Sequence, residues 1–168
     1  GLRSLTRGKH QFHDTELSGV VENAYHALAI DERRTPFAPT LWMYKPKPGQ
    51  TIEQMWFCGV HSDVGGGYPE RGLSDITLDW MVGKARGAGL VFDAAAVKAH
   101  PLEPDPCAAL RNSKTGFYRL TAGIDRAIGW TIKNPDASDD AAKRDDPTQS
   151  VHDSVRARWD SDPKYRPP

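Results

Sequence analysis

The sequence is poor in cysteine, in long hydrophobic runs and in net charge, and each absence excludes a class of protein. Only Cys58 and Cys107 occur, without a paired spacing, so neither a disulfide framework nor a four-cysteine zinc site is predicted. No apolar run approaches the ~20 residues of a membrane-spanning helix. Because the 22 acidic and 22 basic residues cancel, we expect no nucleic-acid partner.

The amino terminus also lacks a targeting signal. Residues 1–13 are polar and basic, without the apolar centre of a signal peptide. The first residue is Gly1 rather than methionine, so we expect an internal piece of a longer chain. A chain of 168 residues with 38% hydrophobic residues has about the length of one domain and can bury a core.

The centre of the chain predicts a helix, a strand and a second helix. Ser18–Asp31 has apolar side chains at helical spacing. Ile52–Val60 is a nearly continuous apolar run, which is typical of a parallel strand buried on both faces. Asp75–Gly87 follows Ser74, a good N-cap residue. We therefore predict an α/β protein in which a layered parallel sheet has flanking helices.

One stretch near the carboxyl terminus is strongly acidic. Residues 134–150 carry five aspartates and few apolar side chains, without the spacing of an EF-hand calcium loop. We expect a solvated or disordered loop there.

A histidine and three glycines follow the predicted strand. In "MWFCGVHSDVGGGY" the apolar run ends at His61, and Gly65, Gly66 and Gly67 come shortly after it. Ligands of open α/β sheets gather at the carboxyl ends of the strands, and an imidazole can move protons near neutral pH. These features are compatible with a catalytic His61, with the three glycines Gly65, Gly66 and Gly67 shaping the loop beside it because they permit positive φ.

The same residues also fit a purely structural turn. His61 would then be the polar cap of a tight strand-to-helix connection, since H-x-D and a glycine triplet are too short to be specific. Asp63 either supports the imidazole of His61 or binds N–H groups of the loop, and its position two residues after His61 favours the loop role. His26 lies in the first predicted helix, where a core or interfacial role is expected.

Longer strings resemble one protein family. "WFCGVHSDVGGGY" followed by "GLSDITLDWM" is similar to the signature of the domain-of-unknown-function 2235 family. "ENAYHALAIDERRTPFAPTLW", which precedes it, resembles a helix of the family and the segment after it, and "SKTGFYRL" and "VHDSV" resemble its carboxyl-terminal portion. That family comprises α/β-hydrolase-like proteins, some of them bacterial phospholipase effectors of the type VI secretion system. The resemblance covers most of the chain.

The resemblance implies a serine-type hydrolase of esters or phospholipids that needs no cofactor. His61 matches the family's candidate histidine, which takes the proton of a serine and returns it to the leaving group. The resemblance also implies lipid degradation, contact with a membrane surface, and a location in the bacterial cytoplasm, with delivery out of the cell by a secretion system as an alternative.

The nucleophile of such an enzyme is missing from these residues. An α/β-hydrolase places its serine in G-x-S-x-G, before the acid and the histidine, and no serine here has that context. We expect residues 1–168 to be the carboxyl-terminal part of one α/β-hydrolase-like domain, partnered by the missing amino-terminal half and inactive alone. A fragment and a truncated or split gene are equally compatible with this expectation.

Two other functions remain open at this point. A non-catalytic remnant or interaction module would use the glycine loop only to turn the chain. A metal-dependent hydrolase would use His61 and Asp63 as ligands, but two ligands are too few for a site, so we predict no metal.

Overall fold

The computed structural model describes residues 15–42, 46–120, 123, 124, 126, 128, 130, 131 and 144–167. Its main sheet has three strands in the order β1-β2-β5, and both pairings are parallel. The strands are β1 Asn23–Ala29, β2 Thr51–Phe57, β3 Trp130–Thr131, β4 Arg144–Asp145 and β5 Gln149–Val151. The helices are α1 His61–Gly65, α2 Gly72–Gly87, α3 Ala94–Ala99 and α4 Asp153–Ser161, with 3-10 turns η2 Thr35–Phe37 and η3 Gly116–Leu120. The α/β class predicted from the sequence is confirmed, and the arrangement is consistent with part of a hydrolase-like fold.

The central strand β2 is buried on both faces, as its apolar run predicts. Trp56 and Phe57, which point to opposite faces, are each 1% exposed. Gln54 is also fully buried, and its side chain accepts the Trp42 N–H (2.8 Å) and donates to Thr148 Oγ1 (3.0 Å). A polar residue is therefore tolerated in the strand because its amide is satisfied.

The helix predicted over Ser18–Asp31 is wrong, because this segment forms strand β1. Its register with β2 runs from Asn23 opposite Thr51 to Ala29 opposite Phe57. Helix propensity is a weak preference that tertiary context overrides, and here the β2 main chain supplies the competing hydrogen bonds. The alanines and leucine that suggested a helix fit equally well between a neighbouring strand and packed helices.

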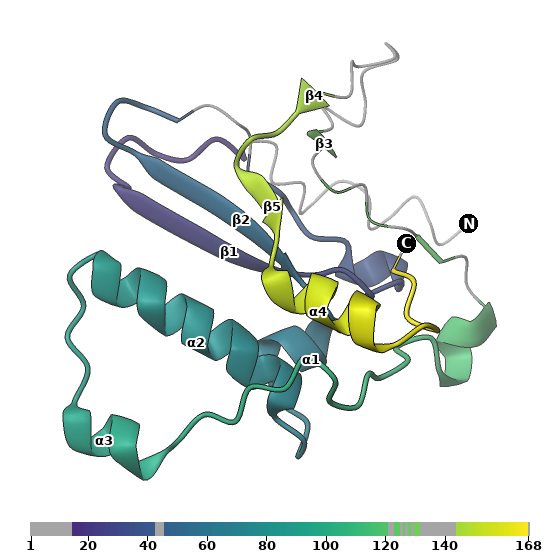
Figure 1. The fold of residues 1–168 in the computed structure, drawn as a ribbon. Helices are drawn as coiled ribbons and strands as arrows, with labels where there is room; N and C mark the ends of the chain where they lie inside the picture. Colours follow the sequence, from purple (N-terminus) through teal and green to yellow (C-terminus); the bar gives the residue numbers. More distant parts are fainter. Residues whose placement is uncertain are drawn as a thin grey trace.

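Helix α2 lies along one face of the sheet, close to β1 and to the short helix α1 (Figure 1). The predicted helix over Asp75–Gly87 is confirmed, with its start at Gly72. Trp80 of α2 contacts the Tyr25 ring of β1 edge-on at 6.1 Å and the Phe57 ring of β2 at 5.4 Å. These aromatic contacts hold α2 against β1 and β2.

Only the end of the acidic stretch 134–150 is among the described residues, because residues 134–143 lie outside them. Asp146, Thr148 and Gln149 are buried, whereas Pro147 and Ser150 are exposed. Asp146 is 3% exposed and accepts hydrogen bonds from the Thr148 N–H (2.9 Å), Thr148 Oγ1 (2.6 Å) and Gln149 Nε2 (3.1 Å). Because this carboxylate is satisfied locally, the chain can continue into β5 and pair with β2.

The carboxyl-terminal segment closes over the strand ends. Tyr165 is 5% exposed and donates to Asp31 Oδ2 at 3.0 Å. Arg158 of α4 donates to the carbonyl oxygens of Pro106 (2.9 Å) and Ala108 (2.7 Å). Segments distant in sequence are thus tied together around the carboxyl end of β1.

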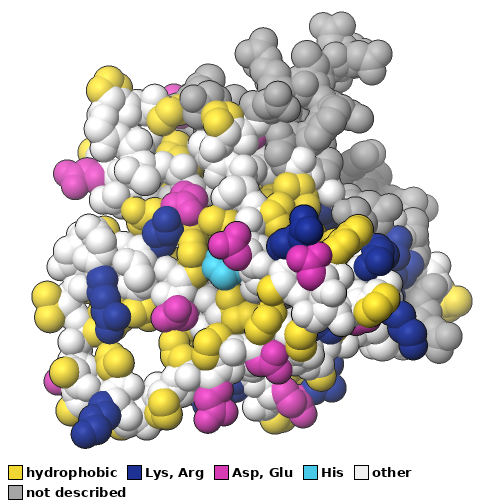
Figure 2. Space-filling view, viewed as in Figure 1, with side chains coloured by type: hydrophobic (Ala, Val, Ile, Leu, Met, Phe, Trp, Pro, Cys, Tyr) yellow, Lys and Arg dark blue, Asp and Glu magenta, His cyan; other side chains and the backbone are white. Residues whose placement is uncertain are grey.

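The face that carries α2, α3 and α4 mixes hydrophobic and charged side chains at its surface (Figure 2). Exposed hydrophobic side chains on α2, α3 and their connection are Leu78, Leu90, Val91 and Val97. Helix α3 buries none of its residues and lies away from the sheet (Figure 1). Within the described residues, no helix combines the length and the apolar character needed to cross a bilayer.

Candidate active site

His61 lies at the carboxyl end of β2, where it begins α1 and is exposed. The strand ends at Phe57, three residues before the predicted end at Val60, because Gly59 turns the chain with φ of +120°. A Cβ on Gly59 would lie 2.5 Å from Cβ of Asp63. The turn that presents His61 therefore requires a glycine at position 59. Sequence reasoning missed Gly59, although its place at the end of an apolar run is a usable signal.

Asp63 faces the main chain of this turn. Its carboxylate is 5% exposed, and Oδ2 accepts the N–H groups of Val60 (3.0 Å) and Arg111 (3.3 Å). Since α1 begins immediately after Val60, the carboxylate satisfies an N–H group that a helix start leaves without a partner. These bonds place Asp63 on the backbone of the loop, while His61 faces outward.

The three glycines differ in conformation. Gly65 is the last residue of α1 and does not have positive φ. Gly66 and Gly67 have φ of +83° and +120°, values that residues with a side chain rarely adopt. Conformational freedom is thus needed at the second and third glycines, whereas Gly65 ends the short helix α1, which the sequence did not predict.

A cavity of about 500 Å³ lies beside His61, between α1, α2 and β1. The small side chains of Ala27 and Ala29 on β1 leave this space open, and Thr77 of α2 places on it a hydroxyl that has no hydrogen-bond partner among the described residues. The rest of the lining comprises His61, Val64, Gly65, Gly66, Gly67, Tyr68, Arg71, Ser74, Asp75, Leu78 and Met81. The cavity is apolar in its strand wall and polar at its glycine loop.

Glu32 and Arg34 form an ion pair next to the main chain of His61. Glu32 is 1% exposed, and its carboxylate accepts two bonds from the Arg34 guanidinium, at 3.0 Å from Nε and 2.7 Å from Nη2. Burial alone would raise the pKa of Glu32, but hydrogen bonds from Arg34, Ser113 and the His61 N–H outweigh it and lower the pKa to about 2. Glu32 is therefore a carboxylate throughout the neutral range.

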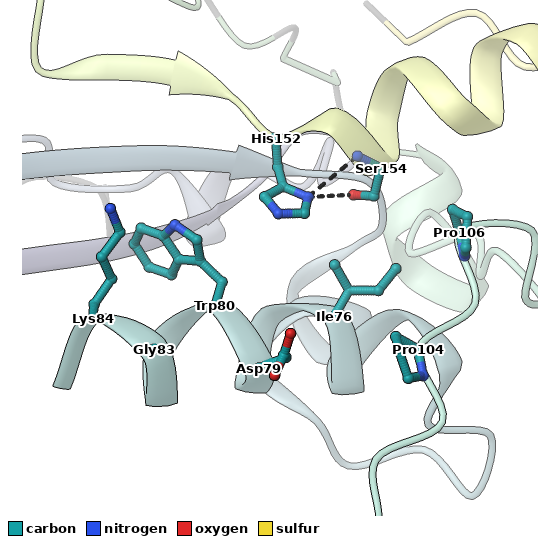
Figure 3. Close-up of a pocket in the computed structure, with 9 residues that line it drawn as sticks. All are labelled: Ile76, Asp79, Trp80, Gly83, Lys84, Pro104, Pro106, His152 and Ser154. Atoms are coloured by element: carbon teal, nitrogen blue, oxygen red, sulfur yellow. Dashed lines mark hydrogen bonds between the residues drawn. The ribbon is translucent and has the colours of Figure 1, made fainter. Parts of the chain in front are cut away.

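A second cavity, of about 640 Å³, lies on another flank of α2, between α2 and the start of α4 (Figure 3). It contains a serine and a histidine in contact, with Ser154 Oγ 2.9 Å from Nδ1 of His152. That nitrogen also accepts the Ser154 N–H at 3.2 Å, so the pair caps α4. The His152 ring stacks on Phe57 with centroids 4.7 Å apart. We place the candidate site at His61 because the histidine of this second cavity has a structural role.

Two part-buried histidines predict a pH dependence of stability. Burial lowers the pKa of His26 and of His152 below the ordinary value of 6.5. Below pH 6.5 the unfolded chain binds protons that the folded chain does not, so stability falls as the pH decreases, by at most about 1.4 kcal/mol per pH unit for each histidine.

We expect the urea midpoint to decrease between pH 6.5 and pH 5, and His26→Phe, which keeps a ring against Trp42, to make this decrease shallower. Urea titrations of both proteins over this range measure the effect. Parallel pH profiles for the two proteins would contradict the assignment of part of the slope to His26.

Among the residues that the structure describes, no cluster of three or more His, Cys, Asp or Glu side chains could hold a metal ion.

The segment that contains His61 is similar to a known protein family. Residues 2–84 match the family described as T6SS, phospholipase effector Tle1-like, catalytic domain. This match includes β1, β2, α1 and most of α2. Over 102 residues the chain is 30% identical to the Saccharomyces cerevisiae protein YEL023C, an alignment that covers 57% of this chain and 14% of the yeast protein. No solved structure matches the chain. Residues 2–84 are therefore similar to the catalytic domain of T6SS Tle1-like phospholipase effectors.

Proposed function

We propose that these 168 residues carry the histidine side of a serine-type ester or phospholipid hydrolase. In this proposal His61 is the general base and acid, and the nucleophilic serine and its acid come from polypeptide outside these residues. The observation that carries the proposal is the position of His61: an exposed imidazole at the carboxyl end of a central parallel strand, beside a cavity and inside the segment of a phospholipase-effector family.

The proton transfers follow from the chemistry of ester hydrolysis. As the serine oxygen attacks the ester carbonyl carbon, a nitrogen of His61 accepts the hydroxyl proton. The resulting imidazolium gives this proton to the leaving alcohol oxygen, and an acyl-enzyme remains. A water molecule then loses its proton to the imidazole, attacks the acyl carbon and releases the acid, and the serine recovers its proton. Exposure of the His61 side chain leaves it accessible to a nucleophile from another segment.

The cavity beside His61 supports a lipid-like substrate. Ala27, Ala29, Val64, Leu78 and Met81 offer an apolar wall of the kind that accepts an acyl chain.

The polar rim of the same cavity supports recognition of an anionic group. The Arg71 side chain is 51% exposed and lies 3.9 Å from the Asp75 carboxylate, so its guanidinium is not enclosed. A guanidinium in this position suits a phosphate diester, which it can bind with two hydrogen bonds. We therefore propose a phospholipid rather than a neutral ester as the substrate.

The described contacts of three serines are compatible with a nucleophile from outside. Ser74 Oγ donates to the Arg71 carbonyl (3.1 Å), and Ser161 Oγ donates to the Ala157 carbonyl (2.7 Å). Ser154 belongs to the cap of α4. None of these three hydroxyls is paired with His61.

Covalent labelling tests this proposal. We expect the isolated chain to show no esterase or phospholipase turnover, because a histidine without a nucleophile cannot form the acyl-enzyme. A fluorophosphonate probe should label the complete gene product on a serine outside these 168 residues, as peptide mapping by mass spectrometry can show. Label on Ser62 or Ser154 with turnover by the isolated chain would place the nucleophile here and contradict the proposal.

An interaction module is the second candidate function. The observation that favours it is the exposed hydrophobic surface of Leu90, Val91 and Val97, next to a helix that buries none of its own residues. Absence of any fluorophosphonate label on the complete gene product would favour this second function. Contact with a membrane surface and delivery by a secretion system stay predictions, and the effector family of residues 2–84 is compatible with delivery.

A further inference from the structure

We propose that Glu32 is a positioning residue that fixes His61 through two routes, one to its main chain and one to its ring. The inference rests on the proposed function, because a positioned imidazole matters for catalysis only if His61 is the base. Glu32 does not itself face the reaction in this proposal: the hydrogen bond it makes with His61 involves the main-chain N–H and not the ring.

The first route follows from the pairing of β1 with β2. Main-chain bonds continue past both strand ends, from the Ile30 N–H to the Phe57 carbonyl (3.0 Å) and from the Asp31 N–H to the Gly59 carbonyl (3.1 Å). These two hydrogen bonds place the next residue, Glu32, beside the start of α1. There Glu32 Oε2 accepts the His61 N–H at 3.3 Å.

The second route runs through an arginine and an aromatic ring. Both oxygens of the Glu32 carboxylate hold the Arg34 guanidinium, whose Cζ lies 3.8 Å from the centroid of the Phe37 ring. The Phe37 ring in turn lies against the His61 imidazole, with centroids 5.2 Å apart and planes inclined by 57°. The Glu32 carboxylate therefore helps to position, through Arg34, the Phe37 ring against which the His61 imidazole packs.

A buried arginine holds the main chain of the same phenylalanine. Arg126 is 8% exposed, and its guanidinium donates to the Phe37 carbonyl at 3.1 Å. Phe37 is thus held by its main chain as well as by its contact with Arg34. With Glu32 almost fully buried, this arrangement has little freedom to rearrange, because each buried charge needs its present partner.

Ring-current shifts in NMR spectra test the geometry without any assay of activity. In this chain, the imidazole C–H resonances of His61, assigned by their loss in His61→Ala, should be displaced by the Phe37 ring. Glu32→Gln should remove this displacement, because a neutral amide cannot hold Arg34 over Phe37. Glu53→Gln is the control: it removes a carboxylate on strand β2 that pairs with Lys84 of helix α2, and it should leave the displacement unchanged.

Kinetics in the complete gene product test the consequence. We expect Glu32→Gln to lower kcat about 10²-fold, the scale on which a displaced catalytic group slows a reaction, with KM changed less than about twofold. Phe37→Leu keeps the ion pair but removes the ring against which the imidazole lies, so a similar loss of kcat is expected and tests the second route even if Glu32→Gln does not fold.

The outcomes separate this inference from the proposed function. Folded Glu32→Gln protein with wild-type His61 resonances and wild-type kcat would overturn the positioning role. If His61→Ala keeps kcat while Glu32→Gln changes the His61 resonances, the geometry is right and the proposed function fails instead.

Discussion

His61→Ala is expected to lower kcat of the complete protein by roughly 10³-fold or more, the scale seen when one member of a catalytic triad is removed. The imidazole is exposed at the start of α1, so its removal leaves no buried cavity. We therefore expect the urea midpoint to stay close to that of the wild-type protein. Steady-state kinetics and urea titration of the same preparation give both values.

His26→Ala is the matched control, since this histidine lies on the neighbouring strand β1. It is part-buried against the Trp42 ring at 5.1 Å, so its truncation should cost on the order of 1 kcal/mol of stability and little kcat per folded molecule. The opposite pattern, with kcat lost in folded His26→Ala and kept in His61→Ala, would mean that His61 is the wrong histidine.

Gly59→Ala is expected to have the largest effect on stability, a loss of about 3 kcal/mol or more from backbone strain and overpacking together. The residue has φ of +120°, and an added Cβ would meet the Asp63 Cβ at 2.5 Å. Asp63 has little room to move, because its carboxylate holds the N–H groups of Val60 and Arg111. Urea-induced unfolding of the variant measures the loss.

Gly65→Ala provides the contrast within the same motif. An added Cβ there meets nothing within 4 Å, and the residue ends α1 without positive φ. The substitution should therefore be neutral or stabilising by up to about 1 kcal/mol, as for glycine replaced in a helix. Equal losses for Gly59→Ala and Gly65→Ala would contradict the assignment of the turn to Gly59.

The sequence predicted the elements whose own residues carry a clear pattern, namely strand β2 and helix α2. The continuous apolar run around Trp56 indicates a strand that is buried on both faces, as is typical of a parallel sheet covered by helices. The second helix lies where the sequence predicts it, but the predicted N-cap Ser74 is wrong, because the helix begins at Gly72 with Arg71 at its N-cap position. His61 at the strand end followed directly from these two elements.

The parts that the sequence did not predict depend on partners distant in the chain. Strand β1 contains the helix-forming residues Ala24, Ala27 and Leu28, and only the presence of β2 selects the extended conformation. The contact of Glu32 with His61 depends on the register of that same pair of strands. The hydrogen bond from the Thr148 N–H to Asp146 could not be predicted either, because the composition of an acidic stretch does not show which donors meet its carboxylates.

The rate of covalent phosphonylation tests the central claim, that His61 activates a serine, most directly. This rate reports on the nucleophile alone, without contributions from deacylation or product release. We predict that His61→Ala slows fluorophosphonate labelling of the complete protein in proportion to its loss of kcat, while His26→Ala labels at the wild-type rate. Labelling of folded His61→Ala protein at the wild-type rate would show that His61 is not the base.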